Sequence, residues 1–292
     1  MKRLFRWMHD AMDRIEIQPR LLERCSYAVI DPAQADATSV SHLPMQSLAP
    51  PAHARLASQL PYVVALRTLG TDEREALFAE ALDRESAGQS SPFCLWIESS
   101  QTPGSVIRHL SRMMIVQSPT DGRPYHLRYH DAHTLMQLSW ILGGTQLKTL
   151  LGPAECWLLP LQGWWRETPQ ERVAAPPSLR LSLEQWQKLR YVGMINVALA
   201  RHDAPIENRS ALGKQLYQSI NGAQKVGLVD EDDVIAFATH SMTRHPQFHQ
   251  HRHILGLLRQ SEGQPKRYMR LSSMLTEAQW QAIVTDVSRQ LG

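Results

Sequence analysis

Short apolar runs separated by an amphipathic segment mark the first half of the chain. The runs are Tyr27 to Ile30, Tyr62 to Leu66 and Phe93 to Ile97, and each has the length of a strand. Between the last two, Asp72 to Ser86 places apolar residues at helical spacing, whereas Asp36 to Pro51 has no period. This order predicts a sheet covered by helices, with a surface loop over the aperiodic stretch.

A hairpin is predicted between Met113 and Tyr129, because Asp121-Gly122 favours a tight reversal between two β-prone runs. The second run alternates between two sets of side chains. We expect the first set to face the core and the second to face away from it. These sets are Tyr125, Leu127 and Tyr129, and His126, Arg128 and His130.

The second half looks helical after the proline-rich stretch Gly163 to Ser178, which is typical of a linker. Ser182 with Gln185 forms a capping box, and Thr276 with Gln279 forms another.

We therefore predict an α/β (or α+β) N-terminal domain over residues 1–165, with a mixed sheet covered by helices. A linker follows over residues 166–178, and an all-helical domain occupies residues 179–292.

Composition indicates an ordinary folded protein. The chain has 292 residues, 31 Lys and Arg against 28 Asp and Glu, and three widely separated cysteines. The even charge does not point to nucleic acid, and unpaired cysteines fit a reducing compartment. The N-terminus lacks the apolar run of a signal peptide, and no stretch has the length of a membrane span. We expect a cytoplasmic protein that does not insert in a membrane.

Four histidines within nine residues form the densest group of metal-ligand side chains. They are His245, His249, His251 and His253. On a helix the first two would share a face while His251 would not, and the glutamate of a HExxH metalloprotease is missing. We expect a polar connecting segment and no cofactor, with a metal-dependent hydrolase as the alternative.

A second candidate cluster could supply an acid, a base and an anion-binding group. It comprises Arg128, His130, Asp131 and His133. In the structural interpretation, which we favour, Asp131 caps a helix and Arg128 pairs with a carboxylate such as Asp31. An acid/base hydrolase stays the alternative. The chain has no GxSxG, GxxxxGK[ST] or GxGxxG motif, so we predict no catalytic residues.

The segment from Arg244 to Arg270 is basic and could contact phosphates. It carries Arg244, Arg252, Arg259, Lys266, Arg267 and Arg270 against the single acid Glu262. The preceding acidic run from Asp230 to Asp233 would repel a nucleic acid. A nucleic-acid-binding regulator is therefore a further, less favoured alternative.

Trp164 and Trp165 are adjacent at the start of the proline-rich stretch, where one core can hardly bury both. Exposed paired tryptophans commonly mark a partner-binding surface, so both are candidate contacts. Equally, one ring could fill a seam between the domains.

The first half also carries a series of short motifs in a characteristic order. The series is Tyr27-Ala-Val-Ile-Asp31, Leu60 to Leu66, Cys94 to Ser100, Ile107 to Leu110, Asp121-Gly122, Leu127 to Asp131 and Leu151-Gly-Pro153. Over about residues 25 to 155 the chain resembles the type VI secretion effector adaptors, or adaptor-chaperones, long catalogued as a domain of unknown function. Asp131 is followed by Ala132 where that family usually carries proline, so a favoured first helical residue is absent.

The resemblance implies a role that the residues alone do not. Adaptors of this family bind a toxic effector protein in the producing cell and help load it onto the spike protein of the secretion machine. They stay behind in the cytoplasm. We therefore expect a chaperone that acts by protein binding, not an enzyme, with the effector as its cargo and the spike as a second partner.

Overall fold

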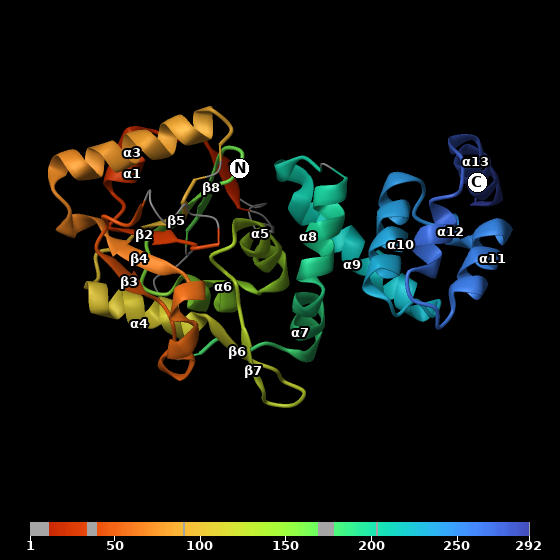
Figure 1. Ribbon diagram of the computed structural model, residues 1–292, viewed down its shortest axis with the longest axis horizontal. Coiled ribbons are helices and arrows are strands. Elements are labelled where there is room, and N and C mark those ends of the chain that lie inside the picture. The colour runs from red at the N-terminus through yellow and green to blue at the C-terminus, as the bar shows by residue number, and fades with distance from the viewer. Residues whose placement is uncertain (1–11, 34–39, 90, 169–177, 203, 292) are drawn as a thin grey trace, which may run out of the picture. The chain divides into compact units, whose positions relative to one another are not determined.

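The structure is a computed structural model that describes residues 12–33, 40–89, 91–168, 178–202 and 204–291 (Figure 1). The chain forms two compact units, Met1–Trp186 and Gln187–Gly292. The predicted linker, residues 166–178, precedes this division, and its residues 169–177 lie outside the described part.

The first unit contains a seven-stranded sheet with the order β1-β9-β8-β5-β2-β4-β3. Its strands are β1 Asp13–Ile15, β2 Tyr27–Ile30, β3 Met45–Ser47, β4 Tyr62–Ala65, β5 Phe93–Glu98, β8 Cys156–Pro160 and β9 Trp164–Glu167. Each described pairing is antiparallel. The predicted fold class is confirmed, and of the two terms offered α+β is the better description.

The three strands predicted from apolar runs are the adjacent strands β5, β2 and β4 near the centre of the sheet. Tyr27 lies opposite Ala65 of β4 and Ile97 of β5, and every residue of β2 is buried. A strand covered on both faces needs apolar residues at successive positions, which is why these runs were recognisable.

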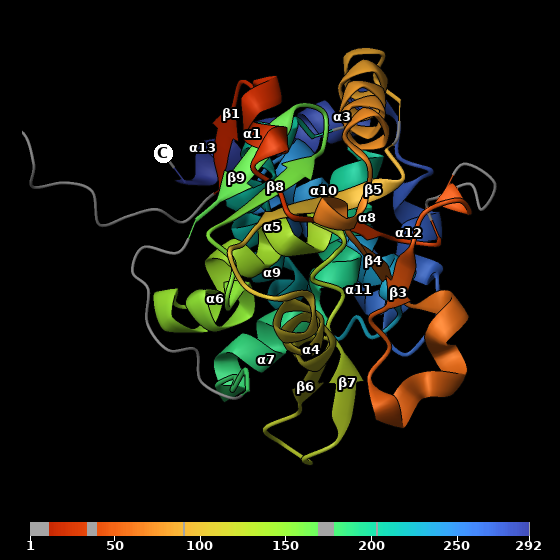
Figure 2. The same cartoon turned by 90° about the vertical axis from the view of Figure 1, so that its left-hand side faces the viewer.

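Helices cover both faces of this sheet. They are α1 Pro19–Glu23, α3 Thr71–Ser86, α4 Pro103–Met113, α5 Ala132–Ile141 and α6 Gly144–Leu151, and a 3-10 segment, η1, spans Pro51–Gln59. Helices α1 and α3 lie on one face, and α4, α5 and α6 lie on the other (Figure 2). The core under α1 and α3 includes Leu22, Ala28, Ile30, Val64, Leu77, Phe78, Ala81, Trp96, Leu158 and Trp164.

The predicted hairpin is present as strands β6 Ile115–Gln117 and β7 Pro124–His126, with Gly122 at φ +68° in the turn. The predicted side-chain alternation is wrong at both ends. Tyr125 is 43% exposed and packs on the Trp186 ring at 4.8 Å, whereas His130 is only 4% exposed. Strand β7 ends at His126, so a two-residue period cannot continue to His130.

Two aperiodic stretches contain strands that the sequence did not reveal. The predicted loop over residues 36–51 includes β3, which pairs with β4 at the edge of the sheet. The predicted linker begins with residues that belong to β9, which pairs with β8 and β1. Strands of three or four residues are too short for alternation to stand out from irregular sequence.

The second unit is built from helices. They are α8 Val192–Arg201, α9 Arg209–Lys225, α10 Glu231–Thr243, α11 Arg252–Ser261, α12 Arg267–Ser272 and α13 Glu277–Leu291, with the 3-10 segments η3 Ile206–Asn208 and η4 Phe248–Gln250. Helix α7, Leu183–Arg190, spans the division between the units. Among the described helices, none combines the length and apolar character needed to span a membrane.

Both predicted capping boxes are confirmed. Ser182 and Gln185 exchange hydrogen bonds at the start of α7, and Thr276 and Gln279 do so at the start of α13. Asp230 accepts hydrogen bonds from the first turn of α10. These polar side chains satisfy backbone N–H groups that the helices themselves leave unpaired.

Candidate functional site

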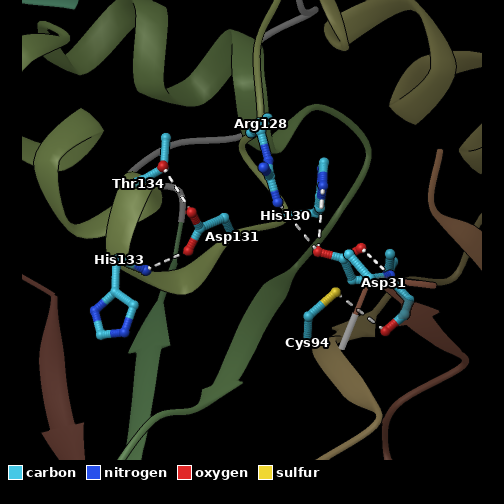
Figure 3. Close-up of polar contacts among 9 residues, drawn as sticks. Asp31, Cys94, Arg128, His130, Asp131, His133 and Thr134 are labelled. Carbon is cyan, nitrogen blue, oxygen red and sulfur yellow. Dashed lines mark hydrogen bonds and ion pairs between the residues drawn. The ribbon is translucent and has the colours of Figure 1, made fainter. Parts of the chain in front are cut away.

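The buried carboxyl group of Asp31 contacts two members of the cluster predicted from the sequence, Arg128 and His130 (Figure 3). Asp31 follows β2 and is 2% exposed. Its Oδ2 lies 3.5 Å from Nη2 of Arg128 and 3.8 Å from Nε2 of His130, and its Oδ1 accepts a hydrogen bond from the N–H of Ala33. The expected contact between Asp31 and Arg128 thus joins segments 97 residues apart.

The segment that carries Arg128 and His130 is fixed by the residues on either side of them. The N–H of Leu127 donates to the carbonyl of Met114, and the hydroxyl of Tyr129 donates to the carbonyl of Leu110 at 2.9 Å. The Tyr129 ring also packs on Trp157 of β8. Because Tyr129 is held in the core, the side chains of Arg128 and His130 on either side of it reach Asp31 at the end of β2.

Asp131 has the expected role at the start of α5. One carboxylate oxygen accepts a hydrogen bond from the N–H of His133, and the other accepts one from the hydroxyl of Thr134, both at 3.0 Å. Both oxygens are therefore engaged in holding the first turn of the helix. His133 enters this network through its backbone N–H.

The electrostatics of the cluster favour a structural role over proton transfer. Burial lowers the pKa of His130 to about 4, although the Asp31 charge acts in the opposite direction. His130 is therefore neutral at pH 7, and Arg128, whose side chain is 58% exposed, supplies the positive charge beside Asp31. The side chains of Asp31 and His130 are buried and contact each other. A substrate can therefore reach them only if this part of the fold opens.

The nearby thiol is not activated for attack. Cys94 is buried, its Sγ lies 3.3 Å from the carbonyl oxygen of Val29, and burial raises its pKa. Burial also raises the pKa of Cys25, and it raises that of Cys156 to about 12. A thiol reacts as its thiolate, so these three groups are suited to packing rather than to nucleophilic chemistry.

Other residues of the motif series also hold the sheet together. The hydroxyl of Tyr27 donates to the carbonyl of Gln101 at 2.6 Å, and Ser99 donates to the carbonyl of Pro153 at 2.9 Å. Gly152 ends α6 with φ +57°, and a Cβ there would collide with the ring of His109 on α4. The motifs that carry the family resemblance are therefore architectural where the structure describes their contacts.

The expectation that Trp164 and Trp165 are exposed is wrong. They are 2% and 4% exposed, and Nε1 of Trp165 donates to the carbonyl of Leu161. Successive residues of β9 point to opposite faces of the sheet, so each ring enters a different layer of the core. A sheet covered on both faces can bury adjacent tryptophans, although a single core could not.

The rings of His245, His249 and His251 have different partners. His245 and His251 accept hydrogen bonds through Nδ1 from nearby backbone N–H groups, and His251 Nε2 lies 3.4 Å from Asp286. His249 packs against Phe237 with its ring centroid 5.6 Å away. Within the described ranges, no three or more His, Cys, Asp or Glu residues form a group that could hold a metal ion.

The basic segment is only partly neutralised. Arg244 forms two hydrogen bonds with Glu277, and Lys266 lies 3.2 Å from Asp232. The side chains of Arg252, Arg259 and Arg270 make no hydrogen bond or ion pair with the described residues. The free charges thus lie on α11 and α12.

Sequence reasoning missed a polar group in the core of the second unit. Nδ1 of His240 lies 3.0 Å from the hydroxyl of Tyr268, and the His240 ring packs on Trp280. Burial, with a smaller contribution from Arg244, lowers the pKa of His240 to about 4. One feature of the sequence pointed to this burial: His240 lies three residues after Phe237 and therefore on the same face of α10.

Comparison with known proteins links part of the chain to a family. Residues 26–149 match the sequence profile of the family described as "Domain of unknown function (DUF4123)". No curated protein and no solved structure gave a significant match to the chain. The matched range includes the Asp31, Arg128 and Asp131 contacts and ends within α6.

Proposed function

We propose that this chain is an adaptor that binds a type VI secretion effector in the cytoplasm of the producing cell and helps load it onto the spike protein. The observation that carries the proposal is the DUF4123 match over residues 26–149, because this family is known in type VI effector adaptors. It covers most of the region in which the motif series resembles such adaptors.

The chemistry of the matched region is compatible with binding as the whole activity. Its most enzyme-like side chains are used between structural elements, since Asp31 contacts Arg128 and Asp131 caps α5. The adaptor then acts through burial of surface against its partners, with charged contacts at the edge of the interface selecting among them. Release follows when the effector passes to the spike or is exported.

Export of the effector encoded beside this chain tests the proposal. The effector is measured outside the cell in the parent strain, in a strain lacking the chain and in a complemented strain. We expect export to be lost without the chain and restored by complementation, while an effector encoded elsewhere is exported normally in all three. Normal export of the adjacent effector without the chain would overturn the proposal.

Co-expression provides the biochemical arm of the same test. The full tagged chain is expressed with the adjacent effector and, separately, with the adjacent spike protein. We expect the effector to co-purify in a fixed ratio with the chain. A well-folded chain that captures neither protein would contradict an adaptor role.

A further inference from the structure

Helix α11 (Figure 1) carries two exposed arginines, Arg252 and Arg259, with a glycine between them. Arg252, Gly256 and Arg259 lie at spacings of four and three residues, so they share one side of the helix. The opposite side is buried and consists of Ile254, Leu257, Leu258 and Ser261. We call the side formed by Arg252, Leu255, Gly256 and Arg259 the α11 face.

The charge of the α11 face is not neutralised within the described residues. Neither the Arg252 side chain nor the Arg259 side chain has a hydrogen bond or ion pair there, whereas Arg244 and Lys266 on neighbouring elements each contact a carboxylate. Seven residues at 1.5 Å per residue separate the two guanidinium-bearing positions by about 10 Å along the helix.

Glycine at position 256 lowers the stability of α11, and a partner that approaches the helix backbone closely would explain its presence. Gly256 lies inside a helix, where glycine is about 1 kcal/mol less favourable than alanine. A Cβ at Gly256 would meet no atom within 4 Å, so packing within the described chain does not require glycine. Gly256 therefore leaves open space at a position between the two arginines and next to Leu255, which is itself exposed.

We propose that the α11 face binds an acidic helix of the effector, with carboxylates about two turns apart pairing with Arg252 and Arg259 and the helix backbone passing close to Gly256. This inference rests on the proposed function and names the surface and the chemistry of the partner. A helix fits better than an extended segment, because α11 offers no free backbone groups and a helix satisfies its own.

Two observations favour an effector over other polyanions. Asp232 neutralises Lys266 and Glu262 is exposed directly after α11, so a phosphate backbone extending past the α11 face would meet carboxylates. The face also lies in the second unit, outside the residues that match the family. Under the proposed function, the effector is the partner that differs between secretion systems. A surface outside the region that the family shares is therefore suited to bind the effector.

A defined peptide tests the α11 face without any assumption about secretion. The probe is a stapled, alanine-rich helical peptide with two pairs of glutamates seven residues apart, and the matched peptide carries glutamines instead. Each is titrated into the full ¹⁵N-labelled chain. We expect the Gly256 amide signal to shift with the glutamate peptide only, and the double variant Arg252→Glu with Arg259→Glu to abolish the shift. No shift, or an unchanged shift in that variant, would overturn the inference.

Gly256→Leu separates docking from folding. Leucine should raise the thermal midpoint of unfolding, because it is the better helix former and its Cβ meets open space. Its side chain should also prevent the peptide helix from approaching the α11 backbone, so peptide binding should be lost. Gly193→Leu, at another open helical position in the same unit, is the control and should leave peptide binding unchanged. Normal peptide binding by a folded Gly256→Leu protein would contradict close approach at this site.

The co-expressed effector completes the test. The double arginine variant should weaken effector capture about tenfold through the loss of two charge pairs and added repulsion. The control is Arg190→Glu with Lys225→Glu, which changes net charge equally on α7 and α9. Equal capture by both variants, or tighter binding of duplex DNA than of the peptide at the α11 face, would overturn the inference. A wild-type chain that binds the peptide but not the effector would instead count against the proposed function.

Discussion

The carboxylate of Asp233 on α10 accepts a hydrogen bond of 2.8 Å from the backbone N–H of Met269 on α12. Asp233 is 1% exposed, so this bond holds a helix terminus from inside the second unit. Its neighbour Asp232 faces outward and pairs with Lys266 and Arg201. Adjacent aspartates in one helix thus have different structural roles.

Asp233→Ala should destabilise the second unit by about 2 to 3 kcal/mol, because it leaves a buried N–H without its acceptor. Asp232→Ala should cost less than about 1 kcal/mol, as expected for surface ion pairs. Hydrogen exchange in α10 and α12 measures both effects. Equal loss of protection in the two variants would show that the contact with Met269 is not what fixes α12.

Asp31 and Arg128 should also contribute unequally to the first unit. Asp31→Ala removes a buried acceptor that binds the N–H of Ala33 and contacts two side chains, so a loss of about 2 to 3 kcal/mol is expected. Arg128→Ala should cost less than about 1 kcal/mol, since that side chain is mostly solvated. Urea unfolding followed by tryptophan fluorescence gives both values. If Arg128→Ala lowers the free energy of unfolding more than Asp31→Ala does, this account of the pair is wrong.

Acid should destabilise both units through buried histidines. The pKa values of His130 and His240 are about 4 in the fold, so between pH 6.5 and about 4 the unfolded chain binds protons that the folded chain does not. Stability then falls as the pH falls through that window.

His240→Gln should flatten the pH dependence in the second unit while it keeps a polar side chain near Tyr268. Hydrogen exchange at pH 7 and pH 5 provides the comparison. His253→Gln, on the exposed side of α11, is the control for removal of an imidazole. If the two variants show the same pH dependence as the wild type, protonation of His240 does not limit acid stability.

The paired tryptophans should behave as core residues of separate layers. Trp164→Ala and Trp165→Ala should each destabilise the first unit by about 3 to 5 kcal/mol, the usual cost of emptying a buried aromatic site. Trp165→Phe should cost more than Trp164→Phe, because only Trp165 donates a hydrogen bond to a described residue, the carbonyl of Leu161. Thermal unfolding checks the order. Alanine variants of wild-type stability would mean that these rings are not part of the core.

The parts of the fold that the sequence predicted are those in which local chemistry decides the structure. Strand β2 is apolar at each position because it is covered on both faces, and Asp131 and Ser182 mark helix starts through their own hydrogen bonds. Strands β3 and β9 were missed because only their pairing with distant strands defines them.

The candidate site was predictable to a similar extent. The contact between Asp31 and Arg128 and the cap by Asp131 follow from charge and position, and both are present. The burial of His130 and of the two tryptophans was not predictable, because it depends on which layer of helices covers each face of the sheet. The open space around position 256 likewise emerges only when the surroundings of Gly256 are known.

The mass and composition of the particle formed by the full chain and its co-expressed adjacent effector test the central claim most directly. Size-exclusion chromatography with light scattering should show a complex of fixed stoichiometry that contains both proteins, with the effector chemically unchanged. Two separately eluting, folded proteins, or an effector processed by the chain, would contradict the account of this protein as a binding adaptor.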